Sequence, residues 1–432
     1  MIWNPSVECM DREDMESLQL QRLQEMVDRI YYNVPFYRQK LQEVGFMPGD
    51  IHHLSDLSRL PFTTKQDIRD NYPFGLFAVP MSEVVRVHAS SGTTGKPTVV
   101  GYTRRDLDYW AEVTARCLYM ANRDRESVVQ VSYGYGLFTG GLGLHGGAER
   151  IGASVIPMSG GNTEKQLMLM QDFGATLLAC TPSYAMHLAE SMEKAGMDRR
   201  KFRLKYGVFG AEPWSERLRT QIEEHWQIKT YDIYGLSEIM GPGVANDCDA
   251  RAGLHIHEDH FYPEIVDPET GASLPDGETG ELVFTTFTKE AFPLLRYRTR
   301  DLSSLQRGVC GCGRTLVRMS QITGRSDDML IVRGVNVFPS QVESVLLEFA
   351  ETAPHYMLTV EREGNLDKLT IEVELSPALF SDTITGLSDI ESRIRRRLES
   401  VLGISSVIKL MEPGSVPRFE GKSQRVIDKR EM

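Results

Sequence analysis

Residues 89–100 read ASSGTTGKPTVV, a stretch in which hydroxyl side chains, two glycines and one lysine lie between apolar residues. Proteins hold phosphate oxygens with backbone N–H groups, hydroxyls and cations, and this stretch supplies all three. We therefore predict that it is a phosphate-binding loop. Its residues are Ser90, Ser91, Gly92, Thr93, Thr94, Gly95 and Lys96.

The stretch does not match the phosphate loop of P-loop NTPases. That loop has four residues between its glycines and a Ser or Thr after its lysine. Here only two residues separate Gly92 from Gly95, and Pro97 follows Lys96. We expect instead a mobile, hydroxyl-rich loop between two strands that closes over a triphosphate. The alternative is an ordinary polar hairpin turn.

Five later motifs accompany this stretch. They are GAEPW at 210–214, YDIYGLSE at 231–238, RYRTRD at 296–301, GRSDDMLIVRGVNVFPSQVE at 324–343 and GKSQR at 421–425. In this order the motifs resemble those of the adenylate-forming acyl-CoA synthetases, and more narrowly the phenylacetate-CoA ligase family, over the whole chain. Two features depart from the pattern of the wider superfamily: Lys96 comes before its proline rather than after it, and the N-terminal part is short. Both look like features of the aryl-CoA ligase branch.

The resemblance implies two half-reactions in one site. A carboxylate attacks the α-phosphorus of ATP to give acyl-AMP and pyrophosphate, and the thiol of coenzyme A then displaces AMP. Two anions must first be brought together, so the site must neutralise charge as it develops. The implied cofactors and co-substrates are ATP, Mg²⁺ and coenzyme A.

The resemblance also implies roles for individual residues. The 90–96 loop would hold the β- and γ-phosphates, and Glu238 would help to hold Mg²⁺. Asp301 would bind the ribose hydroxyls with Arg325 nearby; the alternative is a surface ion pair that contributes little. The residues that would shape the adenine slot are Ala211, Glu212, Pro213, Asp232, Ile233, Tyr234 and Gly235.

By the same resemblance, the C-terminal part carries the catalytic lysine, Lys422, which would reach the bridging oxygen and the carboxylate during adenylation. A rotation of this part about Asp327 would remove the lysine for the second step. Arg333, Gly334 and Asn336 would then lie near coenzyme A. The RIRRR run at 393–397 could contact its phosphates, although charge runs on helices are usually solvated.

Aromatic residues in VSYGYGLFTGGLG suggest where the acid binds. Tyr133, Tyr135, Gly136 and Phe138 lie at an expected strand-to-helix junction, where α/β sheets commonly bind ligands. The glycines would leave room for a flat aryl group. The alternative is ordinary core packing between the strand and the helix.

Three cysteines and a histidine have ligand types suited to structural zinc. Cys248, His255, Cys310 and Cys312 would give a tetrahedral site, with His257 or His260 as alternatives to His255. The other possibility is four unconnected residues with reduced thiols. We expect a structural role in the β-rich region, not a catalytic one.

Short apolar runs alternate with amphipathic ones from Glu126 onward, and this pattern predicts a parallel sheet covered by helices. After about Gly253 the pattern predicts an antiparallel meander or small distorted barrel. We expect an α/β fold with a large domain at 1–325 and a small, mobile α+β domain at 326–432. An amphipathic helix ending near Pro35 should open the chain.

Composition sets the remaining expectations. The formal net charge of -12 argues against a broad nucleic-acid surface, and no segment has the length and apolar character of a membrane helix. Nothing directs the chain out of the cytoplasm, and the resemblance suggests a homodimer. We expect an aryl acid as substrate: phenylacetate, a hydroxylated phenylacetate, an indole acid or benzoate.

Two other functions remain possible. The enzyme could deliver the acyl group to the thiol of a separate carrier protein. Alternatively, the chain could be a nucleotide sensor without turnover, but Lys422 and Glu238 would then have no purpose.

Overall fold

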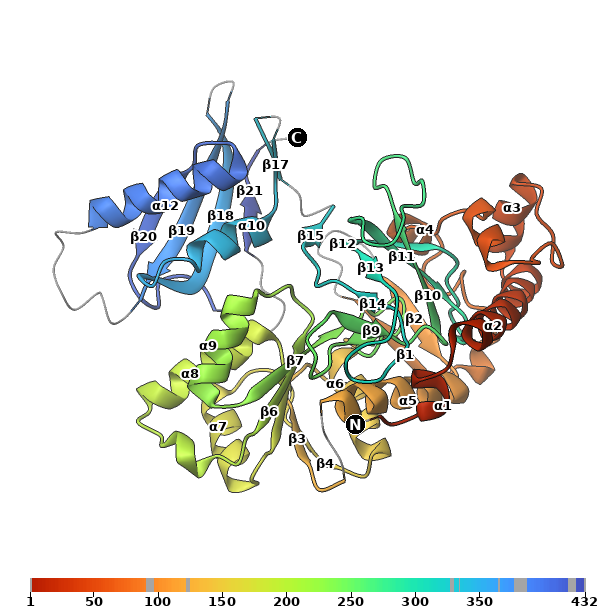
Figure 1. Cartoon of the computed structure of the whole chain (residues 1–432), viewed down its shortest axis with the longest axis horizontal. Coiled ribbons are helices and arrows are strands. Elements are labelled where there is room, and N and C mark those ends of the chain that lie inside the picture. The colour runs from red at the N-terminus through yellow and green to blue at the C-terminus, as the bar shows by residue number, and fades with distance from the viewer. Residues whose placement is uncertain are drawn as a thin grey trace. The chain divides into compact units, whose positions relative to one another are not determined.

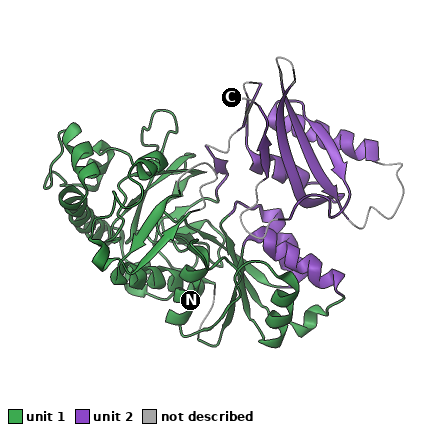
Figure 2. Cartoon of the chain, turned by 180° about the vertical axis from the view of Figure 1, so that it is seen from behind, with its two compact units in different colours: residues 1–180, 196–211, 228–321 green, residues 181–195, 212–227, 322–432 purple. Residues whose placement is uncertain are grey.

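The structure is a computed structural model that describes residues 2–90, 97–121, 125–326, 330–333, 335–363, 366–376, 387–418 and 425–430. Figure 1 labels its helices and strands along the chain. The chain divides into two compact units, coloured separately in Figure 2. Unit 1 comprises residues 1–180, 196–211 and 228–321, and unit 2 comprises residues 181–195, 212–227 and 322–432.

Unit 1 is built around a nine-stranded sheet with the order β13-β14-β9-β8-β7-β6-β5-β3-β4. The strands are β3 (Val128–Val131), β4 (Ser154–Pro157), β5 (Leu177–Cys180), β6 (Tyr206–Gly210), β7 (Lys229–Tyr234), β8 (Ala245–Asn246), β9 (Leu254–Ile256), β13 (Leu305–Gln306) and β14 (Arg318–Met319). Strands β3 to β7 pair in parallel, which confirms the expected α/β fold.

Two antiparallel sheets complete the strands of unit 1. A hairpin is formed by β1 (Arg86–Ala89) and β2 (Val99–Tyr102), and a meander by β10 (Phe261–Val266), β11 (Gly280–Thr286) and β12 (Tyr297–Ser303). The meander matches the pattern change expected after Gly253. Leu254–Ile256 differs from that expectation, because β9 pairs with β8 and β14 in the large sheet.

The α-helices of unit 1 are α1 (Pro5–Glu8), α2 (Arg12–Asn33), α3 (Pro35–Glu43), α4 (Lys65–Asp70), α5 (Arg104–Met120), α6 (Gly140–Arg150) and α7 (Thr163–Asp172). Short 3₁₀ turns lie at Leu54–Arg59, Met81–Glu83 and Arg199–Lys201. As predicted, the first long helix ends just before Pro35, which begins α3.

Glycines in the GGLGLHGG run let α6 approach α5 closely. A Cβ at Gly143 would lie 2.5 Å from the Trp110 ring, and one at Gly147 would lie 2.6 Å from the Thr114 side chain. Real Cβ atoms do not come so near, so larger residues would push the helices apart. These two glycines therefore serve helix packing, whereas the glycines of this stretch were expected to leave room for a ligand.

Within the described residues, unit 2 combines α-helices with a four-stranded sheet of order β20-β19-β18-β21. The helices are α8 (Pro182–Lys194), α9 (Glu216–Trp226), α10 (Pro339–Leu346) and α12 (Leu387–Leu402). The strands are β15 (Gly324–Arg325), β16 (Leu330–Val332), β17 (Val335–Val337), β18 (Thr352–Glu363), β19 (Leu366–Leu375), β20 (Val407–Met411) and β21 (Val426–Asp428). An apolar core joins β18 and β19 to α10 and α12, as expected for a small α+β domain.

In the described part of the chain, no helix has the length and apolar character needed to span a membrane.

Candidate active site

The β1–β2 hairpin holds the two ends of the predicted phosphate-binding loop together. Ala89 pairs with Val99 across the hairpin, and the Ser90 N–H donates to the Thr98 carbonyl at 3.0 Å. The Ser90 and Thr98 hydroxyls also hydrogen-bond each other. The loop between two strands is thus confirmed at its flanks, whereas residues 91–96 lie outside the described residues.

Glu238 lies buried beside the C-terminal end of this loop. The Thr98 hydroxyl donates to its Oε1 at 3.4 Å, and the Lys65 Nζ lies 3.7 Å from the same oxygen. A chain of polar contacts therefore runs from Ser90 through Thr98 to Glu238. The structure brings together two predicted groups, the phosphate loop and the carboxylate expected to hold Mg²⁺.

Two contacts of Glu238 had no distinct sequence signal. Thr98 follows the loop by two positions, and only this proximity could have drawn attention to it. Lys65 is the first residue of α4, far away in the sequence and outside every recognised motif. Its position beside the carboxylate follows from tertiary folding alone.

The predicted nucleotide residues of unit 1 gather where β6 and β7 end. Gly210 pairs with Ile233 in the parallel sheet, so Ala211 and Tyr234 leave neighbouring strands at the same edge. A Cβ at Gly210 would overlap the Ile233 carbonyl, and therefore only glycine fits there. Ala211 adopts a left-handed φ of 69°, a strained conformation that is typical of ligand sites.

Tyr234 and Asp301 contact each other directly. The tyrosine hydroxyl donates to Asp301 Oδ2 at 2.6 Å, which joins β7 to β12. Asp232 precedes Ile233 in β7. The Asp232 N–H donates to Asp247 Oδ1 at 2.9 Å, and this bond fixes the backbone of the strand.

The remaining predicted nucleotide residues belong to unit 2. Glu212 Oε1 accepts a hydrogen bond of 2.7 Å from the Ser183 N–H at the start of α8. This carboxylate therefore stabilises the positive end of that helix. Pro213 is exposed, and Arg325 lies in β15.

The residues expected near coenzyme A lie in or beside the β16–β17 hairpin. Arg333 is exposed, donates through Nε to the Asp367 carbonyl at 2.7 Å and through Nη1 to the Ser405 hydroxyl at 2.8 Å. Asn336 lies in β17, with its side chain outside the described atoms. Gly334, the predicted hinge residue Asp327 and the predicted catalytic lysine Lys422 lie outside the described residues.

The residues expected to bind the acid occupy different environments. Tyr133 is buried, and its hydroxyl donates to the Cys180 carbonyl at 2.5 Å, at the carboxyl end of β5. The Tyr135 hydroxyl contacts His145 Nδ1 at 3.2 Å, and burial raises the pKa of this tyrosine. Gly136 has open space around its Cα, and Phe138 is 42% exposed. Tyr133 thus lies in the interior of unit 1, and Phe138 lies nearer the solvent.

Leu137, which the motifs did not single out, connects this segment to the hairpin. Its carbonyl accepts from the Ala89 N–H at 3.0 Å and contacts His88 Nδ1 at 3.0 Å. The segment predicted to bind the acid is therefore hydrogen-bonded to β1, the strand that precedes the predicted phosphate loop.

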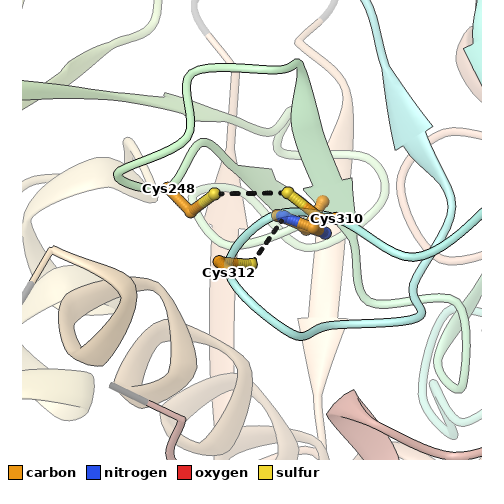
Figure 3. A group of neighbouring side chains, drawn as sticks. Cys248, Cys310 and Cys312 are labelled. Atoms are coloured by element: carbon orange, nitrogen blue, oxygen red, sulfur yellow. Dashed lines mark hydrogen bonds between the residues drawn. The ribbon is translucent and has the colours of Figure 1, made fainter.

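The four predicted zinc ligands converge, with ligand atoms that all lie within 4.8 Å of one another (Figure 3). The Cys248 and Cys310 sulfurs are 3.8 Å apart, and the Cys312 sulfur is 3.4 Å from His255 Nε2. Two thiolates on tetrahedral zinc are separated by about 3.8 Å, given Zn–S bonds of about 2.3 Å. The donor set and its spacing therefore fit zinc.

The two alternative histidines have other partners. His257 Nε2 contacts the Cys117 thiol at 3.4 Å, and His260 contacts the Thr288 hydroxyl at 2.7 Å. Hydrogen bonds from Cys248 and His255 lower the pKa of the Cys312 thiol. A sulfur held as thiolate is the form that binds metal.

Comparisons with known proteins show the family of the chain. The family model described as AMP-binding enzyme matches residues 53–287, and the model described as AMP-binding enzyme C-terminal domain matches residues 334–430. The phenylacetate-coenzyme A ligase of Thermus thermophilus is 53% identical, with 100% of both chains covered. The Escherichia coli enzyme of the same name is 53% identical over 99% of this chain and 97% of its own.

Solved structures give the same assignment. The 2-hydroxyisobutyryl-CoA ligase, determined in the postadenylation state with 2-HIB-AMP, superposes with a TM-score of 0.93 at 30% identity, covering 98% of this chain and 92% of its own. Its complex with 2-HIB-AMP and CoA in the thioesterification state superposes with a TM-score of 0.73, covering 99% and 92%. The chain therefore belongs to the AMP-binding enzyme family, within its phenylacetate-coenzyme A ligase group.

Proposed function

We propose that this protein ligates an arylacetic acid, phenylacetate in the first instance, to coenzyme A through an acyl-AMP intermediate, with release of pyrophosphate and AMP. The polar chain from Ser90 through Thr98 to Glu238 carries the proposal, since it joins a buried carboxylate to the two residues that flank the 91–96 stretch. Relatives at 53% identity over nearly the whole chain support the choice of acid.

The first half-reaction requires that two anions meet. The hydroxyls and amides of residues 90–96 would bind the β- and γ-phosphates, and Lys96 would add a positive charge. Glu238 would hold Mg²⁺ together with phosphate oxygens, the usual coordination of this ion in nucleotide enzymes. The bound ion would reduce the repulsion between the phosphates and the incoming carboxylate. The Lys65 Nζ, 3.7 Å from Glu238 Oε1, adds a positive charge beside that carboxylate.

The nucleoside would lie along the ends of β6 and β7. Asp301, oriented by Tyr234, would accept a hydrogen bond from a ribose hydroxyl, with Arg325 as an additional polar contact. The adenine ring would pack on the tyrosine and the adjoining backbone, formed by Ala211, Glu212, Pro213, Asp232, Ile233 and Gly235.

The acid would bind in the 133–138 segment. Tyr133 would close the inner end of the pocket, Gly136 would leave space for the ring, and Tyr135 with Phe138 would cover it. A flat aryl group matches such a slot better than a long alkyl chain does. Because the Leu137 carbonyl accepts a hydrogen bond from β1, the segment that binds the acid would be fixed in position relative to the phosphate loop.

The C-terminal part would supply one set of groups for adenylation and another set for thioester formation. Lys422 would stabilise the charge that develops when the carboxylate attacks the α-phosphorus. Rotation about Asp327 would then exchange Lys422 for Arg333, Gly334 and Asn336, which would contact coenzyme A. We propose residues 1–325 and 326–432 as the two functional domains of this cycle.

Zinc bound by Cys248, His255, Cys310 and Cys312 would be structural. Four protein ligands leave no open position for a substrate or water, whereas catalytic zinc keeps one. The ion would fix the turn that carries Cys310 and Cys312 against the loop after β8.

The proposal also covers assembly and location. We propose a cytoplasmic homodimer, on the basis of the resemblance to the aryl-CoA ligase branch. Light scattering of the purified protein measures the oligomeric state directly.

Pyrophosphate release across a panel of acids tests the proposed function. Phenylacetate, hydroxyphenylacetate, indoleacetate, benzoate, hexanoate and acetate are compared, each with and without coenzyme A. We expect the aryl acids to exceed the alkyl acids by at least about tenfold in kcat/KM, as a matched pocket allows. We further expect sustained turnover only when coenzyme A is present. Pyrophosphate release that no acid stimulates would refute the proposal.

One outcome of the panel favours the carrier-protein alternative. If aryl acids are adenylated but coenzyme A gives no thioester, the acyl group is transferred elsewhere. Addition of a phosphopantetheinylated carrier protein would then identify the acceptor.

A further inference from the structure

Lys289 has its ammonium group buried in the interior of unit 1, close to Glu238. The residue is 1% exposed and lies in the segment between β11 and β12. None of the recognised motifs contains it. A buried lysine is costly unless its donors are used, so its partners define what it does.

The ammonium group is directed at the turn that carries Glu238. Nζ donates to the Glu238 carbonyl at 3.1 Å and to the Ile239 carbonyl at 2.9 Å. These two groups belong to the turn at 237–240 that follows β7. The Glu238 Cα is bonded to the first of these two carbonyl carbons, so the two hydrogen bonds fix the backbone from which the Glu238 side chain extends.

Aromatic rings surround the other side of the ammonium group. The centre of the Tyr102 ring lies 4.8 Å from Nζ, and that of Phe292 lies 5.2 Å away. Cations are attracted to ring faces, especially when water is excluded. Tyr102 is the last residue of β2, so the lysine is linked to the hairpin that holds the phosphate loop.

The backbone beside Lys289 is fixed as well. Asp106, in the first turn of α5, accepts from the Glu290 N–H at 2.6 Å and from the Ala291 N–H at 3.0 Å. The same carboxylate accepts from the Thr103 N–H at 2.8 Å, which completes the N-terminal cap of that helix. The backbone next to Lys289 is thus held in place by these hydrogen bonds.

We propose that Lys289 is a positioning residue that sets the direction of the Glu238 carboxylate toward the phosphate loop, by binding the carbonyls of Glu238 and Ile239. This inference rests on the proposed role of Glu238 in holding Mg²⁺. Lys289 itself touches neither substrate nor metal. Its effect is to keep the carboxylate within reach of the Thr98 hydroxyl.

Metal binding without turnover tests the proposal. Mn²⁺ serves as the probe, in the presence of a non-hydrolysable ATP analogue, and the free ion is followed by electron paramagnetic resonance. We expect Lys289→Met to weaken Mn²⁺ binding by about tenfold, the effect usual for groups that orient a metal ligand. Lys289→Gln keeps two donors and should recover part of that loss.

Lys40→Met is the matched control. Lys40 Nζ also donates to a backbone carbonyl, that of Phe62 at 3.0 Å, and also lies over an aromatic ring, Phe36, at 4.8 Å. Its contacts are with α4 and the chain before it, not with Glu238. This variant should bind Mn²⁺ as the wild type does.

Glu238→Gln separates the two possible failures. If this variant binds Mn²⁺ normally, the proposed role of Glu238 is wrong. If it loses binding while Lys289→Met retains wild-type affinity, the role of Glu238 stands and the positioning role of Lys289 is overturned. Should Lys289→Met fail to fold, Lys289→Gln is compared with Lys40→Gln by the same measurement and the same criteria.

Discussion

At the scale of single residues, burial of a lysine has a measurable thermodynamic consequence. Burial of Lys289 lowers its pKa to about 7 from a usual value of 10.5, although Asp106 and Glu238 oppose that shift. The unfolded chain therefore holds this proton up to pH 10.5, whereas the native protein releases it above about pH 7. In this window the unfolded state binds more protons, and native stability must rise with pH.

The first prediction follows from this proton difference. Between pH 7.5 and 9.5, the free energy of unfolding of the wild type relative to Lys289→Met should rise by about 1.4 kcal/mol per pH unit at most. Below about pH 6.5 the difference should be constant, because both states are protonated. Urea denaturation over a pH series measures it. A difference that stays level or falls across the alkaline window would contradict the assigned burial.

A second residue-scale prediction concerns Lys422. Lys422→Ala should slow adenylation by about two to three orders of magnitude, the usual cost of one donor that acts in the transition state. Thioester formation from supplied acyl-AMP should continue at a rate near that of the wild type. Rapid-quench measurement of each half-reaction checks the difference. Equal losses in both would show that the lysine is not specific to the first step.

At the scale of elements, the predicted zinc turn depends on residues far apart in the sequence. Cys310 and Cys312 lie in a tight turn where the Gly313 N–H donates to the Cys310 carbonyl at 2.8 Å, with Gly313 at a φ of 91°. Only glycine adopts that conformation without cost. The turn brings both sulfurs close to Cys248 and His255. A metal bound by all four residues would therefore cross-link these segments.

The third prediction is the zinc content. Protein purified without added metal should contain about one zinc per chain, and Cys312→Ser should lose most of it together with several degrees of melting temperature. Cys180→Ala, which changes a buried cysteine in β5 outside the group, should keep its zinc. Elemental analysis and thermal unfolding give both values. Less than about half an equivalent in the wild type would exclude a resident structural ion.

Elements were more predictable from the sequence than contacts were. The alternation of strands and helices from β3 to β7 could be predicted because short apolar runs and amphipathic runs differ in period. The zinc group could be predicted because few residue types bind zinc. Lys65 and Lys289 could not, because a single lysine in a sequence gives no sign of whether the fold will bring it to the Glu238 carboxylate or to the turn that carries it. Their roles depend on contacts between segments far apart in the sequence, which a local sequence pattern does not reveal.

Motif membership also failed to specify what a side chain contacts. The sequence placed Glu212 in a nucleotide motif, yet its carboxylate accepts from the Ser183 N–H at the start of α8. Leu137 was passed over as a plain apolar residue, yet its backbone carbonyl ties the acid segment to β1. Backbone groups carry no sequence signal, and so such contacts appear only in the structure.

At the scale of the whole molecule, unit 2 draws on both matched family regions. Helices α8 and α9 fall within the match at 53–287, whereas the sheet of unit 2 falls within the match at 334–430. His355 Nε2, in β18, lies 3.0 Å from Glu190 Oε1, in α8. If residues 326–432 rotate between the half-reactions, as proposed, this contact should form in one step and separate in the other.

The last prediction uses two glutamates of the same helix. Glu190→Gln should change the ratio of the adenylation and thioester-forming rates by about fivefold, because a partly buried hydrogen bond to a carboxylate contributes roughly 1 kcal/mol to the one arrangement that contains it. Glu193→Gln is the control: Glu193 also pairs with a histidine, His225 at 2.6 Å, but both residues lie within the 53–287 match. That pair should persist through the cycle, and its loss should leave the ratio unchanged. Separate measurement of the two half-reactions tests this prediction. If Glu190→Gln alters the two rates equally, the contact between Glu190 and His355 lasts through both steps, and α8 does not separate from β18.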